Sequence, residues 1–189
     1  MKTQVTLLLL LAFNLSISQS INTEVQKEGK QPYLLGKINK KGLESSIYNT
    51  WFTKGFSSYQ PKDDIISKIR KPLKEYKILV FLGTWCGDSK REVPRFYKIL
   101  EKCNYPMERL TVIAVSNEPG MYKQSPDHEE RDLNIFKVPT FIYYKNGVEV
   151  NRIVESPISS LEEDMYKLIF EKYTPNYSST SKNIKTKPK

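Results

Sequence analysis

The residues best suited to chemistry lie in the segment Trp-Cys-Gly-Asp-Ser at positions 85–89, which directly follows the apolar run 78–82. An apolar run that leads into a basic amphipathic segment predicts a strand followed by a helix, with Cys86 at the helix N-terminus. The helix dipole and the free backbone N–H groups there favour the thiolate, which is the reactive form of cysteine. Ser89 stands where a second cysteine would complete a dithiol motif, so any thiol chemistry here depends on Cys86 alone.

Cys103 is the second of the two cysteines in the chain. If residues 87–102 are helical, the two thiols lie roughly 25 Å apart at the helical rise per residue. A disulfide requires Cα atoms within about 7 Å of each other. We therefore expect no bond between the two cysteines and predict that Cys103 packs at the helix end. The alternative for Cys86 itself is an inert, buried cysteine.

The charges next to Cys86 oppose one another. Asp88 suits the first turn of a helix but disfavours a neighbouring thiolate, whereas Lys90 and Arg91 favour it. The direction of the net shift stays open. His128, the single histidine, lies in a polar acidic segment and is expected at the surface, so a cysteine–histidine hydrolase has little support. No cluster with metal-ligand spacing and no phosphate-binding glycine loop occurs, so we expect neither a metal nor a cofactor.

Alternation between apolar runs and amphipathic segments indicates the α/β class. We predict strands at 78–82, 110–115, 140–144 and 148–154, with a hairpin turn at Asn146-Gly147, and helices at 87–102 and after the Ser159-Ser160 cap. A helical stretch over 43–59, a helix after Pro61 and a short acidic helix opened by Ser125-Pro126-Asp127 are also expected. This order predicts a central mixed sheet flanked by helices on both faces, with an extra N-terminal helical segment.

Three features in the same order resemble the thioredoxin superfamily over residues 76–172. They are Trp85-Cys86-Gly87 followed by Lys90, a proline eight residues after Cys86, and Val138-Pro139-Thr140 before a strand and hairpin. The resemblance implies a thioredoxin-like fold, with a cis proline loop facing the cysteine. It implies a catalytic pair, Cys86 and Ser89, and substrate-binding residues Trp85, Gly87, Val138, Pro139 and Thr140.

Four departures from the family pattern bear on activity. Ser89 replaces the second cysteine, and Asp88 stands where proline is usual. Val80 replaces the buried carboxylate that assists proton transfer, and residues about 117–131 form an insertion. The first and third departures argue against dithiol reductase activity.

The two ends of the chain have distinct compositions. Residues 1–18, with Lys2 before an apolar stretch, are predicted to be a cleavable signal peptide that is too short to span a bilayer. We expect export to the periplasm, or secretion as the alternative, and no integral membrane span. Residues 19–40 are interpreted as a polar linker or arm, 41–173 as the thioredoxin-like domain, and 174–189 as a basic disordered tail.

The sequence thus predicts an exported monothiol-type thiol–disulfide oxidoreductase or isomerase, expected to be a monomer. Its partners would be protein or peptide thiols and disulfides, with glutathione or a separate reductase supplying the second thiol. The alternative is a non-catalytic thioredoxin-fold module that binds a peptide or protein. The net charge of +9 permits a weaker third hypothesis, binding of envelope polyanions through the basic tail. The scattered charges show no nucleic-acid recognition motif, and we expect no nucleic-acid partner.

Overall fold

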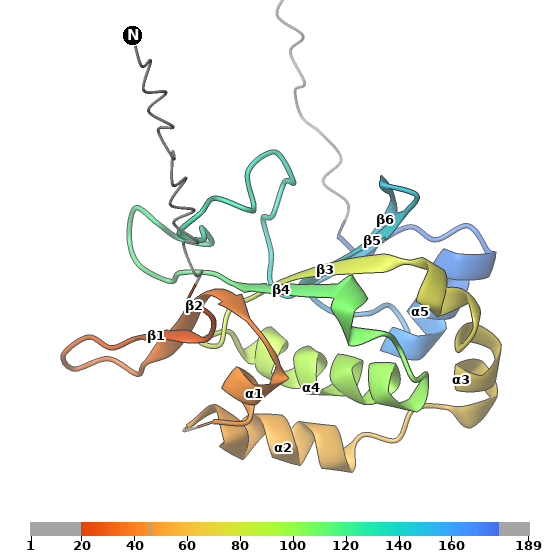
Figure 1. The fold of residues 1–189 in the computed structure, drawn as a ribbon, viewed down its shortest axis with the longest axis horizontal. Helices are drawn as coiled ribbons and strands as arrows, with labels where there is room; N and C mark the ends of the chain where they lie inside the picture. The colour runs from red at the N-terminus through yellow and green to blue at the C-terminus, as the bar shows by residue number, and fades with distance from the viewer. Residues whose placement is uncertain (1–19, 46, 178–189) are drawn as a thin grey trace, which may run out of the picture.

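The structure is a computed structural model that describes residues 20–45 and 47–177. Its centre is a mixed six-stranded sheet with strand order β1-β2-β4-β3-β5-β6 (Figure 1). Strands β3 and β4 are parallel, and the other neighbouring pairs are antiparallel. The strands are β1 (Thr23–Val25), β2 (Tyr33–Ile38), β3 (Lys77–Leu82), β4 (Leu110–Ala114), β5 (Thr140–Lys145) and β6 (Val148–Val154).

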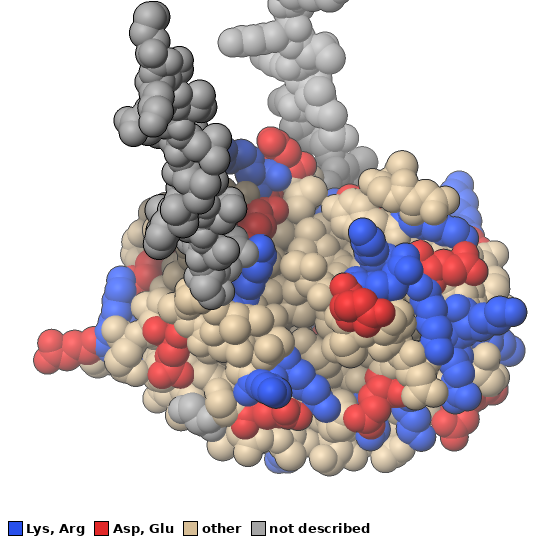
Figure 2. All heavy atoms as spheres, viewed as in Figure 1, with Lys and Arg blue, Asp and Glu red and all other residues tan. Residues whose placement is uncertain are grey.

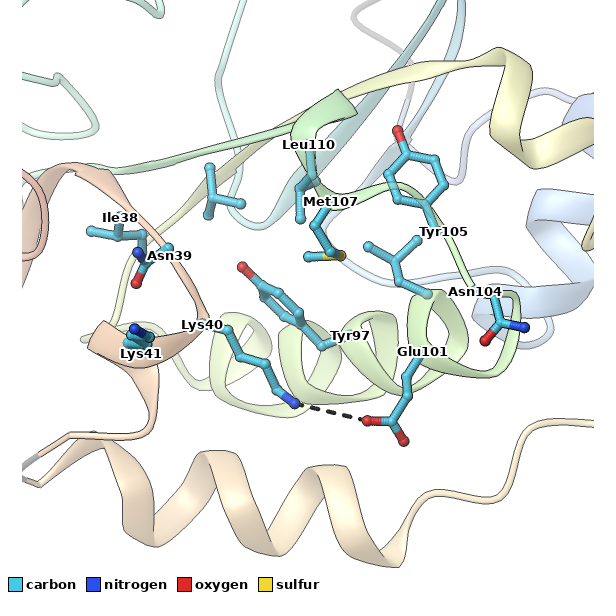
Figure 3. Close-up of a pocket in the computed structure, with 12 residues that line it drawn as sticks. Ile38, Asn39, Lys40, Lys41, Tyr97, Glu101, Asn104, Tyr105, Met107 and Leu110 are labelled. Atoms are coloured by element: carbon cyan, nitrogen blue, oxygen red, sulfur yellow. Dashed lines mark ion pairs between the residues drawn. The ribbon is translucent and has the colours of Figure 1, made fainter.

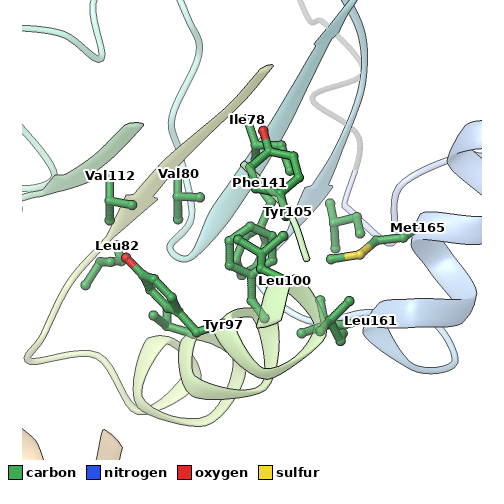
Figure 4. Close-up of a cluster of buried hydrophobic side chains, with 14 of the residues drawn as sticks. Ile78, Val80, Leu82, Tyr97, Leu100, Tyr105, Val112, Phe141, Leu161 and Met165 are labelled. Carbon is green, nitrogen blue, oxygen red and sulfur yellow. The ribbon is translucent and has the colours of Figure 1, made fainter. Parts of the chain in front are cut away.

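The described helices all lie on one side of this sheet (Figure 1). Their bounds are α1 (Lys40–Leu43), α2 (Tyr48–Ser58), α3 (Asp63–Ile69), α4 (Gly87–Lys102) and α5 (Leu161–Phe170), with short 3₁₀ turns η1 (Pro72–Glu75) and η2 (Met107–Arg109). Apolar side chains of β3, β4 and β5 pack there against α4 and α5 (Figure 4). The predicted strands and the helices at 87–102 and after Ser160 are confirmed. Ser160 caps α5 by accepting a hydrogen bond from the Glu163 N–H.

Helix α4, which begins directly after Cys86, packs between the sheet and α2. Pro94 lies inside α4, and a Cβ added at Gly55 of α2 would come within 2.7 Å of its ring. Glycine at position 55 therefore permits a close approach of the two helices at this point. The tight packing on both sides fixes the direction of α4 and hence the place of its N-terminus.

The second face of the sheet differs from the prediction. Its apolar residues, including Phe81 and Ile142, are covered by Leu133 and Ile135 from the segment between β4 and β5. Within the described residues no helix covers this face, so the expectation of helices on both faces was wrong. The short acidic helix expected after Ser125 is also absent. The reason is local, because His128 and other residues that follow have positive φ values, which a right-handed helix excludes.

The interpretation of residues 19–40 as a linker is corrected by strands β1 and β2. Strand β2 pairs antiparallel with β4, and Tyr33, Leu34 and Ile38 are each less than 5% exposed. The segment is polar because β1 lies at the sheet edge and exposes most of its side chains. The predicted signal peptide, and the predicted tail beyond residue 177, lie outside the described residues. Among those described, no helix has the length and apolar character needed to cross a bilayer.

Candidate functional site

Cys86 lies where the sequence predicted it, between the end of β3 and the first turn of α4. It is the N-cap residue of α4 with extended backbone angles (φ −86°, ψ 130°). Its N–H donates to the Gly83 carbonyl at 2.9 Å, which closes the turn between strand and helix. The side chain is half-buried. The first N–H groups of a helix have no partner within the helix, so this position offers donors and a positive dipole end to a thiolate.

The second half of the site is the loop that leads into β5. The Val138–Pro139 peptide bond is cis, and the Cys86 Sγ donates to the Val138 carbonyl at 3.3 Å, across 52 residues of sequence. Thr140 supports the loop, because its hydroxyl donates to the Lys137 carbonyl at 2.7 Å. Within the described residues, no hydrogen bond uses the Val138 N–H. The loop therefore presents unused backbone beside the thiol.

Trp85 forms a wall of the site. Its indole Nε1 donates to the Val115 carbonyl at 2.9 Å, and its ring lies against Tyr122 with ring centroids 5.5 Å apart. A side chain at Gly83 would collide with this ring, since a Cβ there would lie 2.5 Å from Trp85 Cε2. Tyr122 belongs to the insertion, and nothing in the sequence linked it to Trp85.

A hollow of about 540 Å³ adjoins the outer side of Trp85. Trp51 of α2 and Lys90 of α4 also line it. Lys90 makes no ion pair with any residue that the structure describes. Cys86 is not among the residues that line this hollow, so a negatively charged group bound there would lie beside Trp85 and Lys90.

Ser89 has a structural role in this arrangement. Its side chain is fully buried, and its hydroxyl accepts a hydrogen bond from the Gly83 N–H at 3.2 Å. Within the described residues it makes no hydrogen bond to the Cys86 Sγ. Val80, which replaces the family's buried carboxylate, lies in the apolar core. The second thiol and the proton-transfer carboxylate of a dithiol centre are thus both absent from these positions.

The acidic residue beside Cys86 is paired. The Asp88 carboxylate accepts from the Arg91 guanidinium at 2.8 Å, and Arg91 also contacts the buried carboxylate of Glu92 at 2.6 Å. Pairing with Arg91 lowers the repulsion that Asp88 would exert on a thiolate at Cys86. The sequence left open whether Asp88 or the nearby cations would dominate at Cys86. In the structure, Arg91 pairs with Asp88.

The remaining predicted residues lie around the same point. Gly87 is exposed and leaves the space in front of α4 open. Pro139 and Thr140 are buried, so they offer a substrate little side-chain surface. His128 lies at the surface beside Glu130, at 3.3 Å. No group of three or more potential metal ligands occurs in the described part of the chain.

Cys103 is fully buried at the far end of α4, and both cysteines are free. Burial raises the pKa of the Cys103 thiol to about 11. We predict that iodoacetamide at pH 8 modifies the native protein only at Cys86, and that Cys103 reacts once the protein is unfolded, where its pKa returns to about 8.5. Peptide mapping by mass spectrometry would show this. Equal labelling of both cysteines in the native state would contradict it.

These elements define an α/β protein of thioredoxin-like fold, with one cysteine at the active-site position. Thioredoxin 1 of Plasmodium falciparum (isolate 3D7) is 32% identical over 111 residues, which are 59% of this chain and 88% of that protein. Thioredoxin H9 of Arabidopsis thaliana is 27% identical over 132 residues, 68% of this chain and 87% of that protein. The chain belongs to the thioredoxin family.

Two solved structures also resemble this chain, at lower sequence identity. Oxidised thioredoxin O2 from Arabidopsis thaliana is 23% identical, with a TM-score of 0.36 over 57% of this chain and 85% of that one. A protein of unknown function from Pseudomonas aeruginosa has a TM-score of 0.40, is 16% identical and covers 64% of this chain and 68% of its own. No protein-family model matches the sequence.

Proposed function

We propose that this protein is an exported thiol–disulfide exchange protein that acts through a single nucleophile, Cys86. The observation that carries the proposal is the position of the Cys86 thiol, at the N-terminus of α4 and 3.3 Å from the Val138 carbonyl. The thioredoxin relatives suggest a thiol–disulfide redox function. Export to the periplasm, or secretion, is part of the proposal and rests on residues 1–18 of the sequence.

The first step is attack of the Cys86 thiolate on one sulfur of a substrate disulfide. A bond forms between Cys86 and that sulfur, the substrate S–S bond breaks, and the second substrate sulfur leaves as a thiolate that takes a proton from water. The N-terminus of α4 places backbone N–H groups beside the attacking sulfur. Loss of the Cys86 proton also releases the Val138 carbonyl, which together with the free Val138 N–H can pair with an extended substrate backbone.

The second step needs a thiol from outside the motif. The buried Ser89 hydroxyl is not a useful nucleophile toward a disulfide at neutral pH. An external thiolate, from glutathione, a separate reductase or another cysteine of the substrate, attacks the mixed disulfide and releases Cys86 as a thiolate. With a substrate cysteine the result is isomerisation without net redox change. With two external thiols the substrate disulfide is reduced and the external pair is oxidised.

Turnover therefore depends on an added thiol. In the Cys103→Ser protein, reduced and then freed of reductant, we expect one equivalent of thiol released from a peptide disulfide per protein, and no more. Adding glutathione should convert this burst into continuous turnover. Thiol release would be followed by absorbance with a chromogenic peptide disulfide. Repeated turnover without added thiol, or no burst at all, would contradict the mechanism.

A peptide-binding module without catalysis is the second candidate. The observation that favours it is the loss of both accessory groups, at Val80 and Ser89, while Trp85 and its hollow remain formed. This alternative requires that a peptide partner still binds when Cys86 is replaced by alanine. Loss of binding in that variant, with recovery of a covalent adduct in the parent protein, would favour the exchange mechanism.

A further inference from the structure

A second cavity lies at the opposite end of α4 from Cys86, and nothing in the exchange mechanism uses it. Its volume is about 520 Å³, within the range typical of small-molecule sites. It opens between the segment Ile38–Lys41, the second half of α4 and the chain around η2 (Figure 3). The cavity is therefore bounded by three separate parts of the fold.

Tyr97 of α4 directs its hydroxyl into this cavity (Figure 3). The side chain is 3% exposed, and its ring is held edge-on by Phe52 with ring centroids 5.5 Å apart. Within the described residues this hydroxyl makes no hydrogen bond, and it is accessible from the cavity rather than buried in the core. Burial raises the pKa of Tyr97, so the hydroxyl stays protonated and remains a donor. A bound acceptor would complete its hydrogen bonding.

The cavity is donor-rich at one end. The Asn39 side-chain oxygen is already used, since it accepts from the Asn22 amide at 3.0 Å and from the Gly42 N–H at 3.3 Å, which leaves its NH₂ group as a donor. Lys41 is exposed and makes no ion pair with any described residue. Lys40, in contrast, is paired with Glu44 at 3.4 Å and with Glu101, a carboxylate that also lines the cavity, at 3.9 Å (Figure 3). The two lysines outnumber this one carboxylate, so the charge of the lining and its free donors favour an anionic acceptor.

The other end of the cavity is apolar. Leu100 of α4 and Leu110 of β4 form its lining, together with Met107 of η2, which is 45% exposed. Figure 3 shows the Tyr97 hydroxyl between Met107 and Leu110 on one side and the Asn39–Lys41 end on the other. A ligand that satisfies both ends must carry a negative acceptor group on a short apolar body.

We propose that this cavity binds a small amphipathic carboxylate. The carboxylate accepts from the Tyr97 hydroxyl and the Asn39 amide near Lys41, and the hydrocarbon body covers Leu100, Leu110 and Met107. Binding here is independent of Cys86, because the two sites lie at opposite ends of α4. A negative result for this cavity would therefore leave the proposal of thiol exchange unaffected, and the reverse also holds.

The test is titration of the full chain with octanoate, with octanol and octylamine as matched probes of the same length. Calorimetry should show saturable octanoate binding at least tenfold tighter than binding of either control. Tyr97→Phe removes one hydrogen bond to a charged group and should weaken octanoate binding about tenfold or more, with a smaller loss of octanol binding because an alcohol oxygen is a weaker acceptor than a carboxylate. Tyr166→Phe, a tyrosine on α5 outside the cavity, is the control and should bind octanoate like the parent protein.

Lys41→Gln keeps the proposal testable even if the Tyr97 variant folds poorly, because Lys41 is exposed. This variant should weaken octanoate binding severalfold and reduce its dependence on salt. No saturable octanoate binding, equal affinity for octanoate and octanol, or unchanged octanoate affinity in folded Tyr97→Phe protein would each overturn the proposal.

Discussion

Replacing Cys86 by serine is expected to lower thiol–disulfide exchange by this protein to the rate of the uncatalysed reaction. Cys86 is the half-buried thiol at the N-terminus of α4, whereas Cys103 is fully buried with a pKa raised to about 11. A serine hydroxyl at position 86 does not ionise at neutral pH and does not attack disulfides. The rate of release from a chromogenic peptide disulfide, measured with excess glutathione and corrected for the reaction without protein, reports the loss.

Cys103→Ser is the matched control for this experiment. The substitution removes a thiol of the same type from the same helix but leaves the site untouched. It should retain the exchange rate of the parent protein within about twofold at a temperature where both are folded, since Cys103 plays no part in the chemistry. Two results would show that Cys86 is not the nucleophile. One is a Cys86→Ser protein that keeps a substantial share of the exchange rate, and the other is a Cys103→Ser protein that loses it.

Replacing Phe96 by alanine is expected to cost about 3–5 kcal/mol of the free energy of unfolding. Phe96 is fully buried in the centre of α4, and its ring lies 4.7 Å from that of Phe141 on β5. The substitution leaves a cavity between the helix that carries Cys86 and the strand that follows Val138 and Pro139. Urea unfolding followed by circular dichroism would measure the change.

Phe170→Ala serves as the control for the core substitution. Phe170 ends α5 and is 51% exposed, so its removal should change the free energy of unfolding by no more than about 0.5 kcal/mol. Comparable losses in the two variants would show that the packing between α4 and β5 does not dominate the stability of this fold.

Much of the fold was predictable because its central elements follow simple periodic patterns. The run 78–82 is apolar throughout, as a buried strand requires, and the Asn146-Gly147 turn marks the hairpin of β5 and β6. Strand β1 was missed because it lies at the sheet edge and carries polar side chains. Strand β2 was missed because Gly36 and Lys37 interrupt its apolar residues, so it shows neither a continuous apolar run nor a clear alternation. The absence of a helix on the second face could not be predicted, since the acidic segment after Ser125 begins like a helix and its sequence gives no sign of positive φ values such as that of His128.

The place of Cys86 at the N-terminus of α4 was predictable, because an apolar strand that leads into an amphipathic helix is a strong local signal. The contact of its thiol with the Val138 carbonyl joins segments 52 residues apart and was expected only from the family resemblance. Two features escaped the sequence analysis. Tyr122 reaches Trp85 from the insertion, and the Ser89 hydroxyl supports the Gly83 N–H rather than the thiol. Both depend on how a loop folds back, for which residue spacing offers no signal.

The most direct test of the central claim is to identify the covalent intermediate. The reduced full chain would be mixed with one equivalent of a peptide disulfide, quenched with acid within seconds and mapped by mass spectrometry. The single-nucleophile mechanism predicts one peptide attached through a disulfide at Cys86, accumulating because Ser89 cannot release it, and disappearing when glutathione is added. Absence of an adduct at Cys86, or an adduct only at Cys103, would contradict the mechanism.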